Sequence, residues 1–302
     1  MLMAEIATQF LACLTPEQRQ KAAYEFGDPL RRRWTYVPAP RPGASLLGLS
    51  REARKAAHRL LATALSRHAF AQVVTIMALE EVLDLDEGGR RGRHSDDYHL
   101  AIFGRPGAEE WSWRFEGHHV SITATIANGR VEVAPLFLGA HPAGVRHGET
   151  AVVRPLPLEE ELARALVSEL SPALRDQAVI ADVAPSDILT GTSAVTAALE
   201  PPGVRGGSLA SAQRDLLGRL LDVYLERLAP SLRDPHDTAA FSFAWAGPIS
   251  AGAGHYYRIQ GPGLLIEYDN TQDAADHAHS VIRRPGAEFG AGPLAAHLSG
   301  EA

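Results

Sequence analysis

The hydrophobic pattern of the chain alternates between helical and strand-like period, and this alternation limits the folds open to it. Residues 1–90 and 157–229 carry apolar side chains mainly at helical spacing, as in Ser50–Arg67. Each stretch is followed by short runs rich in aromatic and β-branched residues, at about 98–138 and 240–283. This order predicts an α+β fold in which helices pack on one side of antiparallel sheet formed by the two strand groups.

Each strand group is expected to contain four strands, and we interpret residues 1–302 as a single domain. Turn residues separate the runs: Asn128-Gly129 is the preferred dipeptide of a type I′ hairpin, and Gly261–Gly263 separates two later runs. The expected strands are Tyr98–Phe103, Trp111–Phe115, Val120–Ala127, Arg130–Leu138, Ala240–Trp245, His255–Gln260, Leu264–Tyr268 and His277–Arg283.

The two strand groups also echo each other in sequence. Trp111–Gly117 and Phe241–Gly247 both read aromatic, Ser, aromatic, any residue, aromatic, any residue, Gly. A histidine that opens a strand follows each motif, His119 in the first group and His255 in the second. This match leaves open an internal pseudo-two-fold, with a crevice between the halves where a site would lie.

Charge and cysteine content exclude several classes of function. The chain has 36 acidic and 29 basic residues, a net charge of -7, and no basic stripe with interleaved aromatics, so we expect no nucleic-acid partner. The single Cys13 excludes an intramolecular disulfide and a multi-thiolate metal site, and it is consistent with a cytoplasmic protein.

The N-terminal residues and the hydropathy predict no membrane association. Residues 1–14 include Glu5 and Gln9 and lack a basic start, so they read as a helix rather than a signal peptide. No apolar run reaches the roughly 18 residues that a membrane span needs. We therefore expect a soluble, cytoplasmic protein of unknown oligomeric state.

Histidines in the strand groups predict a metal site. His277 and His279 are two residues apart in a strand, so they share a face and can converge on one ion. His118 and His119 are neighbours and oppose each other in a strand, so we expect at most one of them to join unless Gly117 marks a bulge that turns the strand, and the sequence does not decide which. His255 is a further candidate ligand. The expected cofactor is a divalent transition metal, with zinc favoured and copper or iron as alternatives.

Two carboxylates and an arginine supply the remaining candidate chemistry. Glu116 lies beside the first histidine pair and Glu267 lies within an apolar strand, where burial can raise a carboxyl pKa and permit general acid or base work. Arg258 is a candidate clamp for an anionic substrate. The alternative is structural: Glu267 paired with Arg258 or Arg283 as a buried ion pair.

At these residues the chain resembles an uncharacterised family, catalogued as domain of unknown function 3500. The family pattern has an acidic residue where this chain has Arg284. The resemblance implies which residues belong together and implies no reaction. It spans roughly residues 30–290 and rests on Trp113, Glu116–Ser121, Phe137–Pro142, Trp245–Gly247, Tyr256–Pro262, Ile266–Asn270 and His277–Val281.

The sequence thus predicts a metal-dependent enzyme with a histidine-rich site. Metal-assisted hydrolysis of a small molecule is the first expectation, because a metal with an open coordination position lowers the pKa of bound water toward 7. A copper or iron redox enzyme is the second expectation. A third is a non-catalytic protein that binds a small molecule or a metal, with the histidines serving as hydrogen-bond donors.

Overall fold

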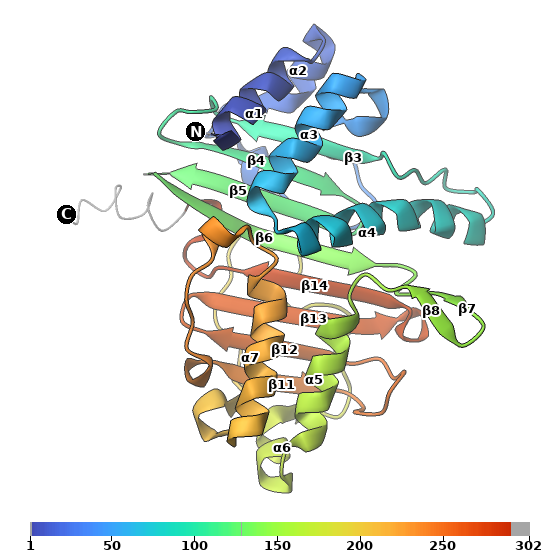
Figure 1. Ribbon diagram of the computed structural model, residues 1–302, viewed down its shortest axis with the longest axis vertical. Helices are drawn as coiled ribbons and strands as arrows, with labels where there is room; N and C mark the ends of the chain where they lie inside the picture. Colours follow the sequence, from blue (N-terminus) through green and yellow to red (C-terminus); the bar gives the residue numbers. More distant parts are fainter. Residues whose placement is uncertain (1, 128, 291–302) are drawn as a thin grey trace.

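One twelve-stranded sheet runs through the molecule in the computed structural model, which describes residues 2–127 and 129–290 (Figure 1). A separate hairpin is formed by β7 (Val145–His147) and β8 (Thr150–Val153). The strands of the large sheet are β1 (Ala23–Tyr24), β2 (Ala44–Ser45), β3 (Tyr98–Phe103), β4 (Trp111–Gly117), β5 (Val120–Ala127), β6 (Arg130–Ala140), β9 (Val179–Ala181), β10 (Val204–Arg205), β11 (Ser242–Ala246), β12 (Tyr256–Gly261), β13 (Leu264–Gln272) and β14 (His277–Arg283).

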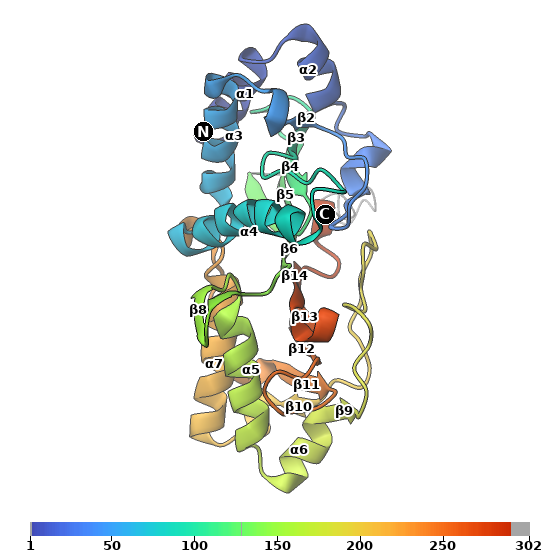
Figure 2. The same ribbon diagram turned by 90° about the vertical axis from the view of Figure 1, so that its right-hand side faces the viewer.

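The long helices lie on one face of this sheet, as the edge-on view shows (Figure 2). Irregular segments 25–43 and 182–203 cover much of the opposite face. The α-helices are α1 (Leu2–Ala12), α2 (Pro16–Ala22), α3 (Arg51–Ala64), α4 (Arg67–Asp86), α5 (Pro157–Glu169), α6 (Pro172–Ala178) and α7 (Ser211–Leu225). Short 3₁₀ turns span Pro29–Arg32, Leu46–Gly48, Gly206–Ser208, Pro230–Leu232, Thr238–Ala240, Asp273–Ala275 and Glu288–Gly290.

The two faces of the sheet differ in chemistry because side chains alternate along each strand. On the helix face, Phe115 lies against His58 of α3, and the Tyr257 hydroxyl donates to the carbonyl of Glu159 in α5. The other face, here called the polar face, carries buried charged and polar side chains that would normally contact water. Its buried members include Arg114, Glu116, Ser121, Thr123, Arg258, Glu267, Asp269, His279 and Arg283.

The α+β architecture expected from the sequence is confirmed, with helices on one side of a sheet built from both strand groups. The antiparallel expectation needs one correction: β1 pairs with β3 and β9 pairs with β11 in parallel, so the sheet is mixed. Strands of two to four residues carry too little periodicity to be predicted. Of the expected Asn128-Gly129 turn, Gly129 has a φ of 73°, and Asn128 lies outside the described residues.

The two strand groups repeat one pairing order on either side of the β6–β14 pair. The path runs β1-β3-β4-β5-β6-β14-β13-β12-β11-β10, with β2 beside β3 and β9 beside β11. In this order β3 corresponds to β11 and β4 to β12. The sequence echo matched Trp111–Gly117 with Phe241–Gly247, which is displaced by one strand, so His119 does not correspond to His255. The pseudo-two-fold itself stays a prediction.

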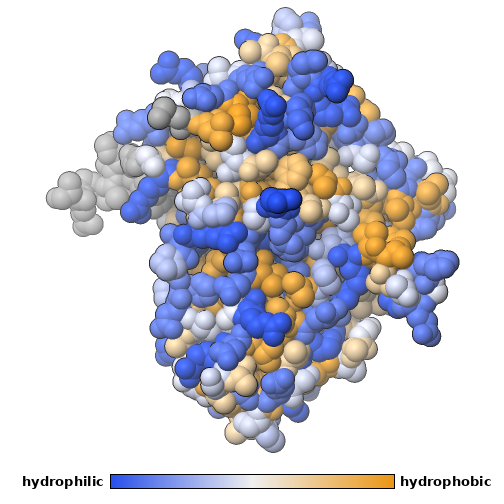
Figure 3. Space-filling model, viewed as in Figure 1, coloured by the Kyte–Doolittle hydropathy of each residue, from blue (hydrophilic) through white to orange (hydrophobic). Residues whose placement is uncertain are grey.

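Polar residues cover most of the helix side of the molecule, interrupted by smaller hydrophobic areas (Figure 3). This follows from amphipathic helices such as α3, which buries Ala57, Leu60 and Leu61 and turns its charged residues outward. Within residues 2–127 and 129–290, no helix is long and apolar enough to cross a membrane.

Candidate metal centre

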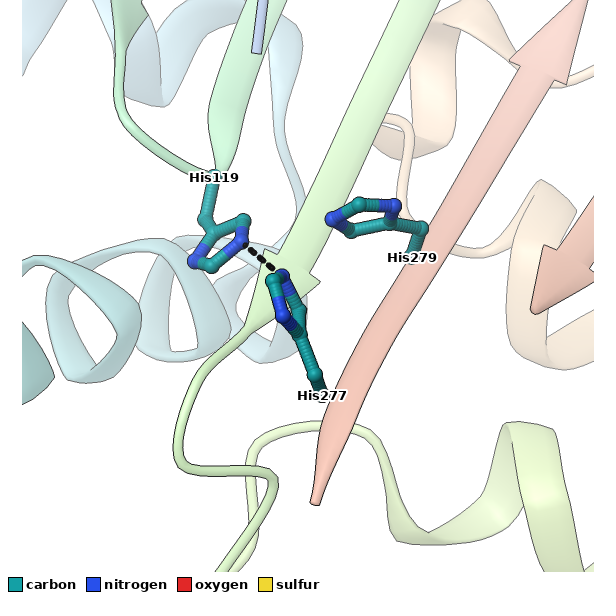
Figure 4. A group of neighbouring side chains, drawn as sticks. All are labelled: His119, His277 and His279. Atoms are coloured by element: carbon teal, nitrogen blue, oxygen red, sulfur yellow. Dashed lines mark hydrogen bonds between the residues drawn. The ribbon is translucent and has the colours of Figure 1, made fainter. Parts of the chain in front are cut away.

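Three imidazoles converge on the polar face, near the point where β6 ends and β14 begins (Figure 4). One ring nitrogen from each of His119, His277 and His279 lies within 4.8 Å of the other two. The Nε2 atoms of His119 and His277 are 2.8 Å apart. The turn between β4 and β5 and the strand β14, from different halves of the chain, therefore bring together three ring nitrogens that no local sequence motif contains.

His119 reaches this cluster because it lies in a turn. β4 ends at Gly117 and β5 begins at Val120, so His118 and His119 form the two-residue connection. His119 has a φ of 62°, and its backbone N–H donates to the carbonyl of Tyr36 at 3.0 Å. The expectation that the two histidines lie in a strand and oppose each other is therefore wrong, since the strand ends before them. His119 is the one that faces His277 and His279.

The position of His277 and His279 follows from β14. Both lie on one face of the strand, as the two-residue spacing predicts, and their ring centroids are 4.7 Å apart. His279 is opposite Gly139 of β6. A Cβ on residue 139 would lie 2.8 Å from Cδ2 of His119 and 3.1 Å from Cδ2 of His279. The absence of a side chain at Gly139 lets the two rings approach each other.

Carboxylates contact the outer nitrogens of two of the three rings, those of His279 and His277. Nδ1 of His279 donates to Asp187 at 2.7 Å, and the hydroxyl of Tyr36 donates to the other Asp187 oxygen at 3.0 Å. Nδ1 of His277 lies 3.1 Å from Asp273. A carboxylate on the outer nitrogen fixes the tautomer and orientation of a metal-binding imidazole. Sequence reasoning missed Asp187 and Asp273, since isolated aspartates outside regular strands carry no spacing signal.

Electrostatics favour the neutral form of His119 and His277, which is the form of imidazole that can bind a metal. Burial, and then the neighbouring imidazoles, lower the pKa of His119 well below its usual value. Burial and the neighbouring rings of His279 and His141 lower the pKa of His277 to about 4. Burial opposes ionisation of Asp187, but hydrogen bonds from His279, Ile188 and Tyr36 lower its pKa overall. At neutral pH the two imidazoles are neutral, so each has a lone pair for a cation.

His118 supports the cluster from the side. Its ring is stacked on that of His119, with centroids 3.7 Å apart. Its Nδ1 lies 2.5 Å from Glu80 and 3.1 Å from Nη1 of Arg93. These contacts account for its Nδ1, so we assign His118 to the packing around His119.

The structure does not bring His255 to the cluster. Its ring is stacked on Trp245 with centroids 4.3 Å apart and also lies against Tyr268, both on the helix face. Its Nδ1 lies 3.1 Å from the carbonyl oxygen of Ala253. The expectation of a ligand here fails because His255 faces the opposite side of the sheet from His279.

The two candidate catalytic glutamates are engaged with the segments that cover the polar face. Glu116 accepts from the backbone N–H of Thr35 at 3.0 Å and from the hydroxyl of Ser121 at 2.7 Å. Glu267 accepts from the N–H of Leu189 at 2.6 Å and from the hydroxyl of Tyr256 at 2.9 Å. Neither carboxylate belongs to a group of metal-ligating atoms in the described residues. Both geometries favour a structural role.

Arg258 lies beneath segment 182–203. It is fully buried, it is opposite Glu267 across β12 and β13, and its guanidinium donates to the carbonyl of Pro201. A substrate cannot reach this guanidinium without displacing the covering segment, so the clamp expected from the sequence is not formed. The alternative, an ion pair of Glu267 with Arg258 or Arg283, is not formed in the described residues either, because Arg258 bonds the carbonyl of Pro201 and Arg283 pairs with Glu288.

Comparison with known proteins places the chain in a family. The model of the family described as Protein of unknown function (DUF3500) matches residues 2–291. The chain belongs to this family. The match contains all members of the histidine cluster, together with Asp187, Asp273 and Gly139. No curated protein and no solved structure matches the chain.

Proposed function

We propose that the chain is a metal-dependent enzyme that holds a divalent transition metal through His119, His277 and His279 and hydrolyses a small molecule. The observation that carries this proposal is the convergence of three ring nitrogens within 4.8 Å, on two elements distant in sequence. Three imidazoles gathered at one point in a buried region would be costly unless they had a common partner.

The donor set favours zinc. Three protein nitrogens with a fourth position open to solvent are typical of catalytic zinc, which lowers the pKa of bound water toward 7. His277 retains 13% exposure of its side chain, so solvent reaches the cluster from this side. The residues of the chain bind and orient in this proposal: three rings hold the ion, and Asp187 and Asp273 fix two of the rings.

Metal content and turnover test the proposal together. Zinc bound per purified chain should fall by one ion in His279→Ala and stay unchanged in His147→Ala, a histidine exposed on β7. Chromogenic esters, amides and phosphate esters are the substrates to screen. Zinc-dependent turnover should be lost in His279→Ala and retained in His147→Ala. Equal zinc content in the wild type and His279→Ala would overturn the site.

A copper or iron redox enzyme is the second candidate, and one contact favours it. The ring of Tyr36 lies edge-on to His279, with centroids 5.0 Å apart, which places an oxidisable side chain beside a ligand. Imidazole donors suit copper and iron as well as zinc. A coloured form that retains copper or iron in preference to zinc and turns over an oxidant would replace hydrolysis. Stable metal without any turnover would favour a binding protein.

A further inference from the structure

Two further groups of ligand atoms adjoin the three-histidine cluster, one on each side. Glu80, His118 and His119 form the first, and His141, Asp273 and His277 form the second. In each group the ligand atoms lie within 4.8 Å of one another. Each group shares one histidine with the central cluster, so the question is whether either of them holds a cation of its own.

The first group already contains a positive charge. Nη1 of Arg93 lies 3.1 Å from Nδ1 of His118 and 3.4 Å from a carboxylate oxygen of Glu80. The other oxygen of Glu80 is 2.5 Å from the same ring nitrogen of His118. A divalent cation here would be repelled by the guanidinium and would have to displace it. This group therefore packs against His119 rather than binding an ion.

The second group has no such cation. Within residues 2–127 and 129–290, Asp273 forms ion pairs with histidines and with no lysine or arginine. One oxygen of Asp273 lies 3.1 Å from Nδ1 of His277 and 3.5 Å from Nε2 of His141. The rings of His141 and His277 are stacked, with centroids 4.4 Å apart. Two ring nitrogens and one carboxylate oxygen therefore lie within 4.8 Å of one another without a lysine or arginine partner among the described residues.

An unusual turn brings the carboxylate there. Asp273, Ala274 and Ala275 have φ angles of 49°, 54° and 69°, a run of left-handed residues without a glycine. Asp276 anchors the turn, since its backbone carbonyl accepts from the N–H of Ala143 at 2.8 Å. The side chain of Asp273 is 57% exposed, so the group opens to solvent. An ion can enter from this side without moving the covering segments.

We propose a second divalent cation site formed by His141, Asp273 and His277, with His277 shared between the two ions through its two ring nitrogens. Two imidazoles and one carboxylate suit zinc, iron and manganese. The proton on the second nitrogen of His277 leaves to solvent when the second ion binds. The inference rests on the proposed function in one respect, since the shared ring also belongs to the first site.

Zinc stoichiometry of the full chain tests this proposal. The wild type should bind two ions, Asp273→Asn one, His279→Gln one and His277→Ala none. Asparagine tolerates left-handed φ as aspartate does, so Asp273→Asn preserves the turn. Asp182→Asn, at an exposed aspartate, is the control and should bind two ions.

The outcomes separate this inference from the proposed function. One ion in the wild type, lost in His279→Gln and kept in Asp273→Asn, would overturn the second site and leave the first. One ion lost in Asp273→Asn and kept in His279→Gln would support the second site and overturn the first. A wild type without bound zinc would overturn both.

Copper(II) provides an independent readout of the shared ring. Two copper(II) ions bridged by one imidazole couple magnetically. The electron paramagnetic resonance signal of the fully loaded wild type should therefore be weaker than that of two isolated ions. Asp273→Asn should give the full signal of one ion. A full signal of two uncoupled ions in the wild type would overturn the sharing of His277.

Discussion

At the scale of single residues, Gly139 controls how closely the histidines approach. It is the partner of His279 across β6 and β14, and a Cβ there would lie 2.8 Å from Cδ2 of His119 and 2.9 Å from the carbonyl of Ala278. Contacts this short force a ring or a strand to move. The conformational freedom of glycine is secondary here, because what matters is the missing volume.

Gly139→Ala should therefore weaken zinc binding and destabilise the fold together. Overpacking of this kind typically costs about 1–3 kcal/mol. Gly27→Ala is the control, since nothing lies within 4 Å of the Cβ it would add. Zinc affinity from chelator competition and the melting temperature are the measurements. An affinity for Gly139→Ala equal to that of Gly27→Ala would show that the rings are not packed as described.

Asp187 offers a residue-scale test of ligand orientation. Its carboxylate accepts from Nδ1 of His279, which leaves Nε2 of that ring for the proposed ion. Asp187→Asn should lower zinc affinity by about 10- to 100-fold, as loss of an outer carboxylate usually does. Asp182→Asn, in the same segment, should bind as the wild type does. The idea fails if both variants bind zinc equally well.

At the scale of elements, segment 182–203 explains why charged side chains are buried on the polar face of the sheet. Glu267 holds the backbone at residues 189 and 190, and the amide of Gln260 bonds both the N–H and the carbonyl of Leu199. Arg283 donates to the carbonyl of Ser193 at 2.6 Å. Side chains of the polar face thus provide hydrogen-bond partners for the backbone of a long irregular segment. This segment in turn places Asp187 beside His279.

Glu267→Gln tests this docking role. An amide would direct a donor toward the N–H groups and hydroxyls that now donate to the carboxylate, so stability should fall by about 1–3 kcal/mol. Proteolysis within 182–203 should accelerate, while zinc content stays unchanged. Melting temperature and cleavage mapping provide the readout. Loss of turnover with an unchanged melting temperature would instead restore Glu267 as a general base.

The elements also show what the sequence can predict about the site. Residue parity along a strand correctly puts His277 and His279 on one face. Parity fails for His118 and His119 because a two-residue turn replaces the strand at that point. Segment 182–203 has no periodicity at all, so the position of Asp187 beside His279 depends on tertiary contacts that a single sequence does not encode locally.

At the scale of the whole molecule, the strand order explains why the sequence echo is displaced. An aromatic residue at every second position is typical of a half-buried strand with a wide apolar face, so the match of Trp111–Gly117 to Phe241–Gly247 does not identify strands that correspond in the fold. Pairing order is more informative, because β3 and β11 each have one parallel and one antiparallel short neighbour. Chain-wide pairing is a property of the fold that local pattern does not contain.

Folding of the whole molecule also buries imidazoles in their neutral form, which predicts acid sensitivity. Burial lowers the pKa of His255 to about 4 from 6.5. Between these values the unfolded chain takes up a proton that the folded chain excludes, so stability is complete above 6.5 and falls as the pH decreases toward 4. At about 1.4 kcal/mol per pKa unit, His255 alone contributes about 3 kcal/mol to this loss.

His255→Gln should flatten this dependence. Glutamine does not titrate, so the free energy of unfolding in the presence of a chelator should decrease less between pH 7 and pH 4.5 than in the wild type. His147→Ala, at an exposed position, should keep the wild-type slope. The comparison uses slopes because His255→Gln also loses the stacking on Trp245, which lowers stability at every pH. Parallel curves for the wild type and His255→Gln would mean that His255 gains its proton in the folded state as readily as in the unfolded chain.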